Sequence, residues 1–547
     1  MKKAFTFFIL ICLVSSVLKS NTIPYSFAPA NADSVLVKQY VILTANNISS
    51  FFYNTGVFNQ DMRTGNTAGF EWPKGSGKTA IFTSGLCLIG MHGSQGRMAS
   101  ASYKGEFQPG YTMNKGYYHN TGFKMYTVKT GDNCSNNPDY ANWGLMVPYG
   151  APYYDVNANG VYDACIDIPG VKNSAQTIFQ CITDANGSAH NSGEGFGGGT
   201  LPLYAEVHMT SWSYTIPGME DVQFMKWEIV NKSDTAWTKF YAGLFYDSDI
   251  GSSNDDYNGC DTTRNLGYSY NAAASDLTYG ANPPAAGVSV LRGLKSGSDS
   301  IKMNSFAFLS GTGSSTPPCE VSLSVANIYN FFRGYKNDET PYLVPGSLQQ
   351  TKYCYSGDPE TASGWTEYVG KINNCGGTLT GDVVASAPGD KRFLIGIGKD
   401  NFTFAPGQKQ TIVTAQLVAQ GVNNKNSVTK LKTLSDAARN FYHANSNDIV
   451  SVRSVSSNVP DKFSLNQNFP NPFNPETNIK FAIPLNGFVE LNVFDLSGKL
   501  IETLVSQNLT TGEYEVNFNG MNLSSGIYFY TLKTDKFSET KKMILVK

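Results

Sequence analysis

The sequence predicts a mainly β protein: an antiparallel β-sandwich body with one late helix, followed by an Ig-like β-sandwich C-terminal domain. Charged residues make up only 15% of the 547 residues, against roughly 25% in an average soluble protein. Gly, Ser, Asn, Thr and Tyr replace them, a mixture that suits strands joined by many turns. Short segments alternate apolar and polar residues without intervening helical segments, so a parallel sheet with crossover helices is not expected.

The body strands are predicted from this alternation. In Val222–Asn231, Trp227 and Ile229 share one face while Lys226 and Glu228 share the other, which predicts a half-buried antiparallel strand. The other clear candidates are Val35–Thr44, Trp237–Tyr246, Arg392–Ile397 and Gln410–Gln420.

One helix is expected near the end of the body. Asn426 and Ser427 are candidate N-caps, because their side chains can accept hydrogen bonds from the first turn. Apolar residues then recur at helical spacing: Val428, Leu431, Leu434, Ala438 and Phe441. We expect this face to pack on the sheet; a helix that binds a partner is the alternative.

The N-terminus has the pattern of a secretory signal peptide. Lys2 and Lys3 precede the apolar run Ala4–Leu18, which is too short for a stable membrane span. A single N-terminal anchor is the alternative. Cleavage near Ser20 removes three lysines and no acid, so the net charge of −2 becomes −5. Such a chain has no basic surplus for nucleic acid. The predicted division is signal 1–20, body 21–445, linker 446–463 and C-terminal domain 464–547.

Nine cysteines are present, and Cys12 leaves with the signal. The remaining even number suggests disulfides in an exported chain, without fixing their connectivity. Cys354 with Cys375 is the favoured pair, because both lie in one polar, Gly-containing region. Cys87 lies in the apolar run Leu86–Ile89 and is expected to be a buried free thiol. The others are Cys134, Cys165, Cys181, Cys260 and Cys319.

The C-terminal domain begins with a proline-rich segment that excludes helix. Alternating segments separated by turns then predict an Ig-like sandwich: Asn478–Ile483, Phe488–Asp495, Lys499–Leu504, Glu513–Phe518, Gly526–Thr534 and Lys536–Val546. Several motifs occur in a fixed order: NFPNPFNP at 468–475, VFDLSG at 493–498, GEY at 512–514, LSSGIYFY at 523–530 and KKM at 541–543.

In these motifs the domain resembles the type A C-terminal sorting domain of the type IX secretion system. The resemblance implies Sec-dependent passage to the periplasm, recognition by an outer-membrane translocon and removal of the domain. The cargo is then released or attached to surface lipopolysaccharide. The body is similar to uncharacterised surface proteins that carry this domain, a likeness that implies no activity. An Ig-like stalk or sugar-binding module is the alternative.

The first candidate metal loop runs from residue 155 to residue 167. Asp and Asn at alternate positions, followed by Gly160, are typical of the start of a calcium loop. The loop resembles thrombospondin type 3 calcium repeats, but Ile166 stands where an EF-hand has its bidentate Glu. A surface loop rich in Asx turns is the alternative. The expected ligands are Asp155, Asn157, Asn159, Val161 through its carbonyl, Asp163 and Asp167.

The second candidate is an acidic loop after a predicted strand. Five carboxylates close together repel one another, and a bound calcium ion relieves that repulsion. A solvated acidic loop and a pair of catalytic carboxylates are the alternatives. The expected ligands are Asp247, Asp249, Asp255, Asp256 and Asp261.

Two glycine-rich motifs and the histidines do not support a cofactor. Gly75–Thr79 lacks the first glycine of a phosphate loop, and Gly193–Gly198 runs on through glycine without a following helix, so nucleotide binding is not expected. No histidine has zinc-ligand spacing with another His or Cys. The nearest approach to a hydrolytic or zinc site is the group His190, Glu194, Glu206 and His208.

The sequence therefore predicts an exported protein of the cell surface or medium. Its body is interpreted as a structural or adhesive scaffold whose loops are stabilised by calcium. A carbohydrate-binding protein and a secreted polymer hydrolase remain open as alternatives, because abundant Tyr and Phe can stack on glycans and carboxylates can catalyse hydrolysis.

Overall fold

The structure is a computed structural model that describes residues 39–157, 159, 161–190, 194–296, 299–310, 317–321, 324–445, 453–456, 460–485, 487–509, 511–520 and 523–546. The predicted signal peptide, Cys12, and most of the predicted linker at 446–459 lie outside these residues. Within them the protein is mainly β, and the paired strands are antiparallel apart from two isolated bridges. The expected fold class is confirmed.

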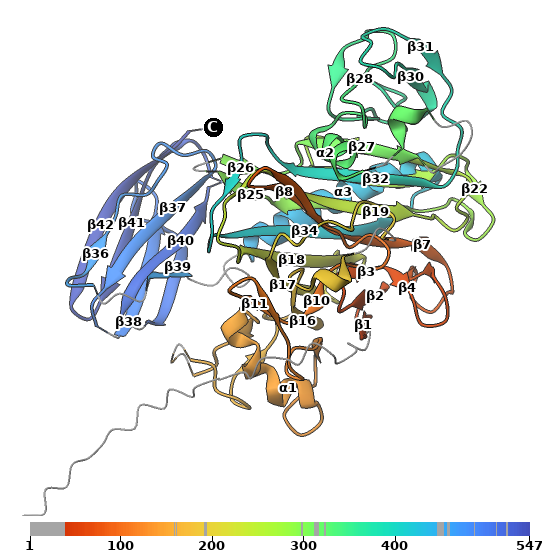
Figure 1. Cartoon of the computed structure of the whole chain (residues 1–547). Helices are drawn as coiled ribbons and strands as arrows, with labels where there is room; N and C mark the ends of the chain where they lie inside the picture. Colours follow the sequence, from red (N-terminus) through yellow and green to blue (C-terminus); the bar gives the residue numbers. More distant parts are fainter. Residues whose placement is uncertain are drawn as a thin grey trace, which may run out of the picture.

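Two large sheets form the body and pack face to face (Figure 1). The first has the order β27 (Ser305–Ser310), β32 (Lys391–Gly398), β19 (Trp237–Ser248), β8 (Thr83–His92), β3 (Val57–Phe58), β2 (Ser49–Tyr53), β6 (Phe70–Glu71) and β7 (Thr79–Ile81), with β1 (Tyr40–Leu43), β9 (Gln95–Ala99) and β33 (Thr403–Phe404) beside them. The second has the order β10 (Gln108–Pro109), β16 (Gln176–Thr183), β17 (Ala205–Ser213), β18 (Val222–Asn231), β34 (Lys409–Ala419), β24 (Ala285–Arg292), β21 (Leu266–Asn271) and β20 (Asp256–Asp261), with β13 (Tyr126–Lys129) beside β16.

The inner faces of the two sheets share one apolar core. Leu88 and Leu244 of the first sheet pack in the same cluster as Trp227 and Ile412 of the second. A polar contact also crosses the interior, because Asn59 donates from Nδ2 to Gln416 Oε1 at 2.7 Å. These contacts make the body a sandwich of two sheets, in the described part of the chain.

Short two-stranded antiparallel sheets lie outside the two large sheets. They are β4 (Gln60–Asp61) with β5 (Thr67–Ala68), β11 (Tyr111–Met113) with β12 (Gly116–Tyr118), β14 (Tyr153–Tyr154) with β15 (Ile168–Pro169), β22 (Ser275–Asp276) with β23 (Gly280–Ala281), β25 (Leu294–Ser296) with β26 (Asp299–Ile301), β28 (Tyr342–Leu343) with β29 (Gln350–Thr351), and β30 (Lys371–Asn373) with β31 (Asp382–Val384). Two further helices are α1 (Pro138–Asn142) and α2 (Val325–Arg333).

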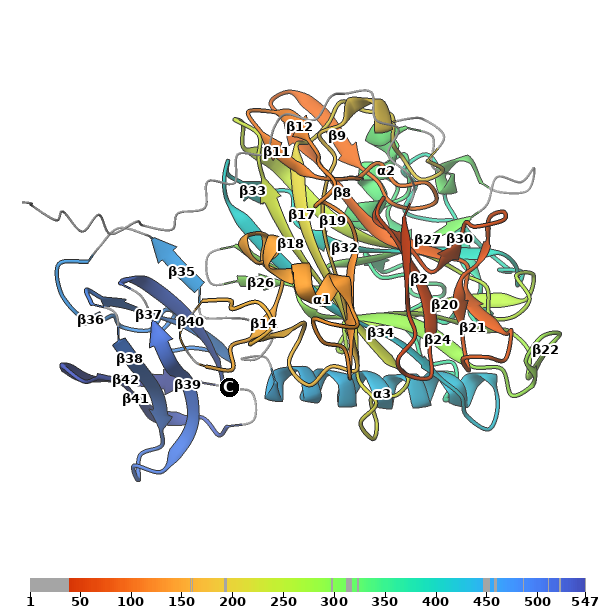
Figure 2. The ribbon, with the colours of Figure 1, turned by 90° about the horizontal axis from the view of Figure 1, so that it is seen from below.

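The predicted late helix is α3 (Asn424–Ala444). It lies along the outer face of the second sheet, as Figure 2 shows, and its apolar stripe is confirmed: Val428, Leu431 and Ala438 are buried against that sheet. The expected N-cap residues, Asn426 and Ser427, are wrong, because the helix begins about one turn earlier. Asn423 is the N-cap and accepts a hydrogen bond from the Asn426 backbone N–H at 2.8 Å. No helix among the described residues is long and apolar enough to span a membrane.

The expectation that Val222–Asn231 is half-buried is wrong, although its bounds match β18. Lys226, on the face expected to meet solvent, is only 8% exposed. The outer face of the second sheet is covered by α3 and by residues 111–151, which meet Glu228 at Gly150. A strand's own pattern cannot show what distant segments cover it.

The favoured disulfide Cys354–Cys375 is wrong. Cys375 pairs with Cys319, and Cys134 pairs with Cys165. Cys354 is a fully buried free thiol in the main core. Its backbone lies beside β27. The free, buried state expected for Cys87 is confirmed.

The C-terminal domain consists of two four-stranded antiparallel sheets around its own core. Val489, Leu491 and Val493 point into that core, as their alternation predicts. β35 lies within the predicted linker and pairs with β40. The strands are β35 (Arg453–Ser456), β40 (Gly512–Asn519), β37 (Glu476–Ile483) and β36 (Ser464–Leu465) in one sheet, and β39 (Leu500–Leu509), β38 (Gly487–Phe494), β41 (Gly526–Thr534) and β42 (Phe537–Leu545) in the other.

Replacing Leu431 with Ala is expected to destabilise the body by about 2–5 kcal/mol, because a fully buried side chain leaves a cavity between α3 and the sheet. Denaturant unfolding of both proteins measures the difference. Lys430→Ala changes an exposed neighbour on the same helix and is expected to change stability by less than about 0.5 kcal/mol. Equal effects of the two substitutions would contradict the packing described for α3.

Candidate functional site

Carboxylates from two separate segments meet at one edge of the body. Asp247 lies near the end of β19, Asp249 lies in the loop that follows, and Asp390 immediately precedes β32. One oxygen from each lies within 4.8 Å of the others. β19 and β32 are paired, with Asp247 opposite Arg392, so the sheet register holds the two segments together. We call Asp247, Asp249, Asp390 and the neighbouring Asp255 and Asp256 the acidic cluster.

The acidic cluster contains buried oxygens without hydrogen-bond donors. The Oδ1 atoms of Asp247, Asp249, Asp255 and Asp256 are all buried and have no partner. The other oxygen of Asp247 accepts hydrogen bonds from the Tyr103 hydroxyl at 2.7 Å and from Arg392 Nε at 3.2 Å. Buried carboxylate oxygens without donors are strongly unfavourable, so this edge lacks positive charge or protons.

The raised pKa values in the acidic cluster agree with this shortage of hydrogen-bond donors and positive charge. Burial raises the pKa of Asp247 to about 6, although Arg392 opposes the shift. Burial, with the charges of Asp247 and Asp390, raises the pKa of Asp249 to about 7. Burial raises the pKa of Asp256 well above its ordinary value. At neutral pH these groups favour either bound protons or a bound cation.

The structure does not bring Asp261 to this cluster. Asp256 begins β20 and Asp261 ends it, which separates them by roughly 17 Å along the strand. Asp261 pairs instead with Arg264, at 2.8 Å from Oδ2 to Nη1. Asp390 was not predicted from the sequence, because it lies far along the chain from Asp247. Only the pairing of β19 with β32 brings it close to the other acids.

Side-chain amides within the loop at 155–167 form hydrogen bonds to one of its own carboxylates. Asn157 and Asn159 donate from Nδ2 to the same oxygen of Asp163, at 2.7 and 2.6 Å. Asp155 Oδ1 accepts from the Asn159 backbone N–H at 3.3 Å, and Asn159 Oδ1 accepts from that of Val161 at 2.8 Å. Asparagine amides point at Asp163 here, so a cation would require both side chains to turn their oxygens inward.

Asp167 acts as a fixed anchor of the same loop. It is fully buried and accepts from the backbone N–H groups of Val156 and Asp163, at 2.9 and 2.7 Å. The disulfide between Cys134 and Cys165 holds the loop to the preceding segment. Calcium binding by this loop stays a prediction.

The four residues of the predicted hydrolytic group separate into different environments. His190 lies beside Asp184, with its Nε2 2.8 Å from the Asp184 backbone oxygen. Glu194 accepts hydrogen bonds from the backbone N–H groups of residues 102–105, which anchors the glycine-rich loop. That loop leads without a helix to β17, and Gly75–Thr79 leads directly to β7.

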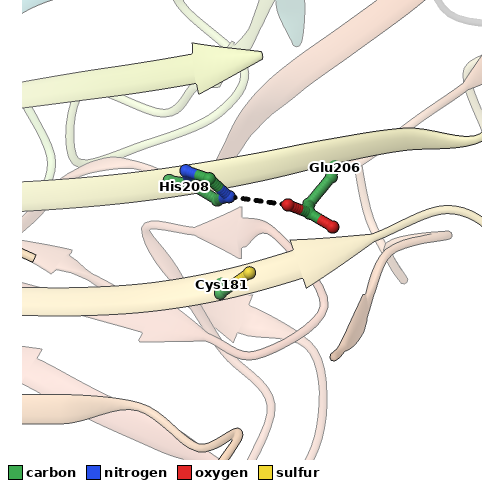
Figure 3. A group of neighbouring side chains, drawn as sticks. All are labelled: Cys181, Glu206 and His208. Atoms are coloured by element: carbon green, nitrogen blue, oxygen red, sulfur yellow. Dashed lines mark hydrogen bonds and ion pairs between the residues drawn. The ribbon is translucent and has the colours of Figure 1, made fainter. Parts of the chain in front are cut away.

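Glu206 and His208 do lie together, and Cys181 joins them (Figure 3). His208 Nε2 lies 2.9 Å from Glu206 Oε1. All three side chains are buried. Cys181 could not be found from local sequence, because it becomes a neighbour only through the pairing of β16 with β17.

A depression of about 360 Å³ lies elsewhere on the body. Its lining includes Lys124, which forms an ion pair with Asp139. The remaining lining residues are Asn120, Thr121, Gly122, Tyr126, Asn142, Leu145 and Met146. None of them is an acid or a histidine, so this depression holds no acid–base pair for hydrolysis.

Comparisons with known proteins give little for the body. No curated protein matches the chain. Among solved structures, a polysaccharide lyase aligns at 9% identity over 62% of this chain and 34% of its own, with a TM-score of 0.15. PorZ, a surface component of the type IX secretion system of Porphyromonas gingivalis, aligns at 12% identity over 92% of this chain and 64% of its own, with a TM-score of 0.12. The chain thus spans about a third and just under two thirds of these structures, and neither score supports a shared fold.

The C-terminal domain does match a family. Residues 467–547 match the family described as "Secretion system C-terminal sorting domain". The match covers β37 to β42 and the proline-rich segment before them, where the sequence motifs were found. The C-terminal part of this chain is therefore a type IX secretion C-terminal sorting domain.

Proposed function

We propose that this protein is an exported structural or adhesive scaffold whose body is stabilised by calcium at the acidic cluster. Export rests on the sorting domain, which indicates delivery by the type IX machinery to the cell surface or the medium. The scaffold role is supported by long paired strands and two disulfides. The cation is supported by four buried carboxylate oxygens without donors.

Calcium suits the acidic cluster better than other common cations. Its ligands are hard oxygens, and it accepts six to eight of them in irregular geometry. The grouped carboxylates of Asp247, Asp249 and Asp390 are joined by neither sulfur nor imidazole. Extracellular sites that bind calcium only at 10⁻⁴–10⁻³ M are common, so an exported protein can use a weak site. The loop at 155–167 is proposed as a second, separate calcium site.

The hydrolase alternative has one observation in its favour. Asp247 and Asp249 are neighbouring acids with raised pKa values, as an acid–base pair requires. However, Asp247 is held by Tyr103 and Arg392, and it is only 3% exposed. The depression described above has a different lining. A cation therefore accounts for more of the geometry than catalysis does.

Deleting residues 467–547 is expected to leave the protein in the periplasm, because the translocon then has no signal to recognise. Cell fractionation and surface labelling measure the distribution. A reporter carrying a signal peptide and residues 460–547 serves as the matched control and is expected to reach the surface or medium. If the truncated chain still leaves the periplasm, the sorting role is wrong.

Calcium is expected to raise the Tm of the full mature chain, and EDTA to reverse the rise, because a ligand of the native state stabilises it. A single site at one hundred times its Kd adds about 2.7 kcal/mol. The double substitution Asp247→Asn with Asp249→Asn is expected to remove most of this increment. Asp261→Asn is the control, since Asp261 lies outside the cluster, and it should retain the increment. An undiminished response in the double variant would exclude the acidic cluster.

Without calcium, the contribution of Asp247 and Asp249 to the Tm is expected to be lost as pH rises from about 4 to about 7. The folded pKa values of Asp247 and Asp249 lie above those of the unfolded chain, so the native state binds more protons in this window. The Tm of wild type relative to the double Asn variant is therefore expected to decrease over this range. Thermal melts of both proteins in EDTA at several pH values measure this, and an increase of that difference with pH would contradict the assignment.

A further inference from the structure

Three adjacent strands of the second sheet place a mixed set of metal-binding side chains in one row. Cys181 of β16 lies opposite His208 of β17, and His208 lies opposite Glu228 of β18. Glu206 precedes His208 by two residues, so both side chains lie on the same face. The ligand atoms of Cys181, Glu206 and His208 lie within 4.8 Å of one another. This group is separate from the acidic cluster.

The three side chains are fixed by the surrounding backbone. Glu206 Oε2 accepts from the Thr112 backbone N–H at 2.9 Å, and Oε1 faces His208 Nε2 at 2.9 Å. Cys181 Sγ donates to the Gly110 carbonyl at 3.3 Å. Glu206 is also approached by Lys232 Nζ at 3.6 Å, but that side chain is 34% exposed and can move into solvent. Figure 3 shows Cys181 and the His208–Glu206 pair on neighbouring strands.

The second ring nitrogen of His208 gives an independent observation. His208 is only 6% exposed, and its Nδ1 is buried without a hydrogen-bond partner. A Cβ at Gly150 would lie 2.8 Å from Glu228 Oε2 and 3.9 Å from His208 Nδ1, so both atoms border the same point. A histidine that binds metal through Nε2 is oriented by a carboxylate near its other nitrogen. Glu228, which lies opposite His208 in the strand pairing, is the carboxylate on that side of the ring.

We propose that Cys181, Glu206 and His208 bind a zinc-class divalent ion. Thiolate, imidazole and carboxylate together are typical zinc donors and do not suit calcium. Three protein ligands leave the fourth tetrahedral position for water or another group. On binding, the S–H bond of Cys181 breaks, its proton passes to solvent, and the sulfur forms a bond to the ion. His208 supplies Nε2.

Cobalt(II) titration of the full mature chain, after chelation and under reducing conditions that leave disulfides intact, tests the site. The expected result is one cobalt per chain that gives a thiolate-to-cobalt absorption band in the near ultraviolet and is displaced by zinc. Cobalt bound at the acidic cluster gives no such band, because no sulfur lies among those ligands. No thiolate band in the wild-type chain would overturn the proposal.

Matched variants locate the ligand. Cys181→Ser is expected to lose the band and His208→Gln to weaken binding at least tenfold, whereas Cys87→Ser, which changes another buried free thiol, keeps it. A band that survives in Cys181→Ser overturns the proposal. If Cys181→Ser does not fold, X-ray absorption of the zinc-loaded wild-type chain decides: one sulfur at about 2.3 Å is expected, and a shell without sulfur overturns the assignment.

Discussion

The register of the long antiparallel strands is the constraint on which the rest of this structure depends. A shift of one residue would turn every side chain of a strand to the opposite face. The register between β19 and β32 brings Asp390 and Arg392 to Asp247, and the register across β16, β17 and β18 aligns Cys181, His208 and Glu228. Both candidate metal sites therefore depend on the same two-sheet packing that forms the core.

Some charged side chains of the body are buried at the edges of the sandwich. Arg392 neutralises part of the acidic cluster, yet four carboxylate oxygens there lack donors. By contrast, Glu194 is surrounded by backbone N–H groups and Asp261 by an arginine. The contrast separates acids with fixed hydrogen-bond donors from acids whose buried oxygens have none. The sorting domain has a separate apolar core and no cysteine, so export and stabilisation of the body rest on different parts of the chain.

Local patterns predicted much of this fold. The strand at Val222–Asn231, the apolar stripe of α3 and the strands of the C-terminal domain follow from side chains close together in sequence. Features set by distant segments could not be found that way: the partner of Cys375 is 56 residues away, and the covering of Lys226 comes from residues outside its strand. The candidate sites show the same division. Asp247 and Asp249 were predicted from one loop, whereas Asp390 and Cys181 required the strand pairing.

The most direct test of the calcium assignment is a crystal structure of the mature chain grown with calcium chloride, with anomalous diffraction collected to locate the ion. The account predicts an anomalous peak at the acidic cluster, coordinated by oxygens of Asp247, Asp249 and Asp390. If those carboxylates instead share protons or bind only water in saturating calcium, their unpartnered oxygens have another explanation and the calcium-stabilised scaffold is wrong.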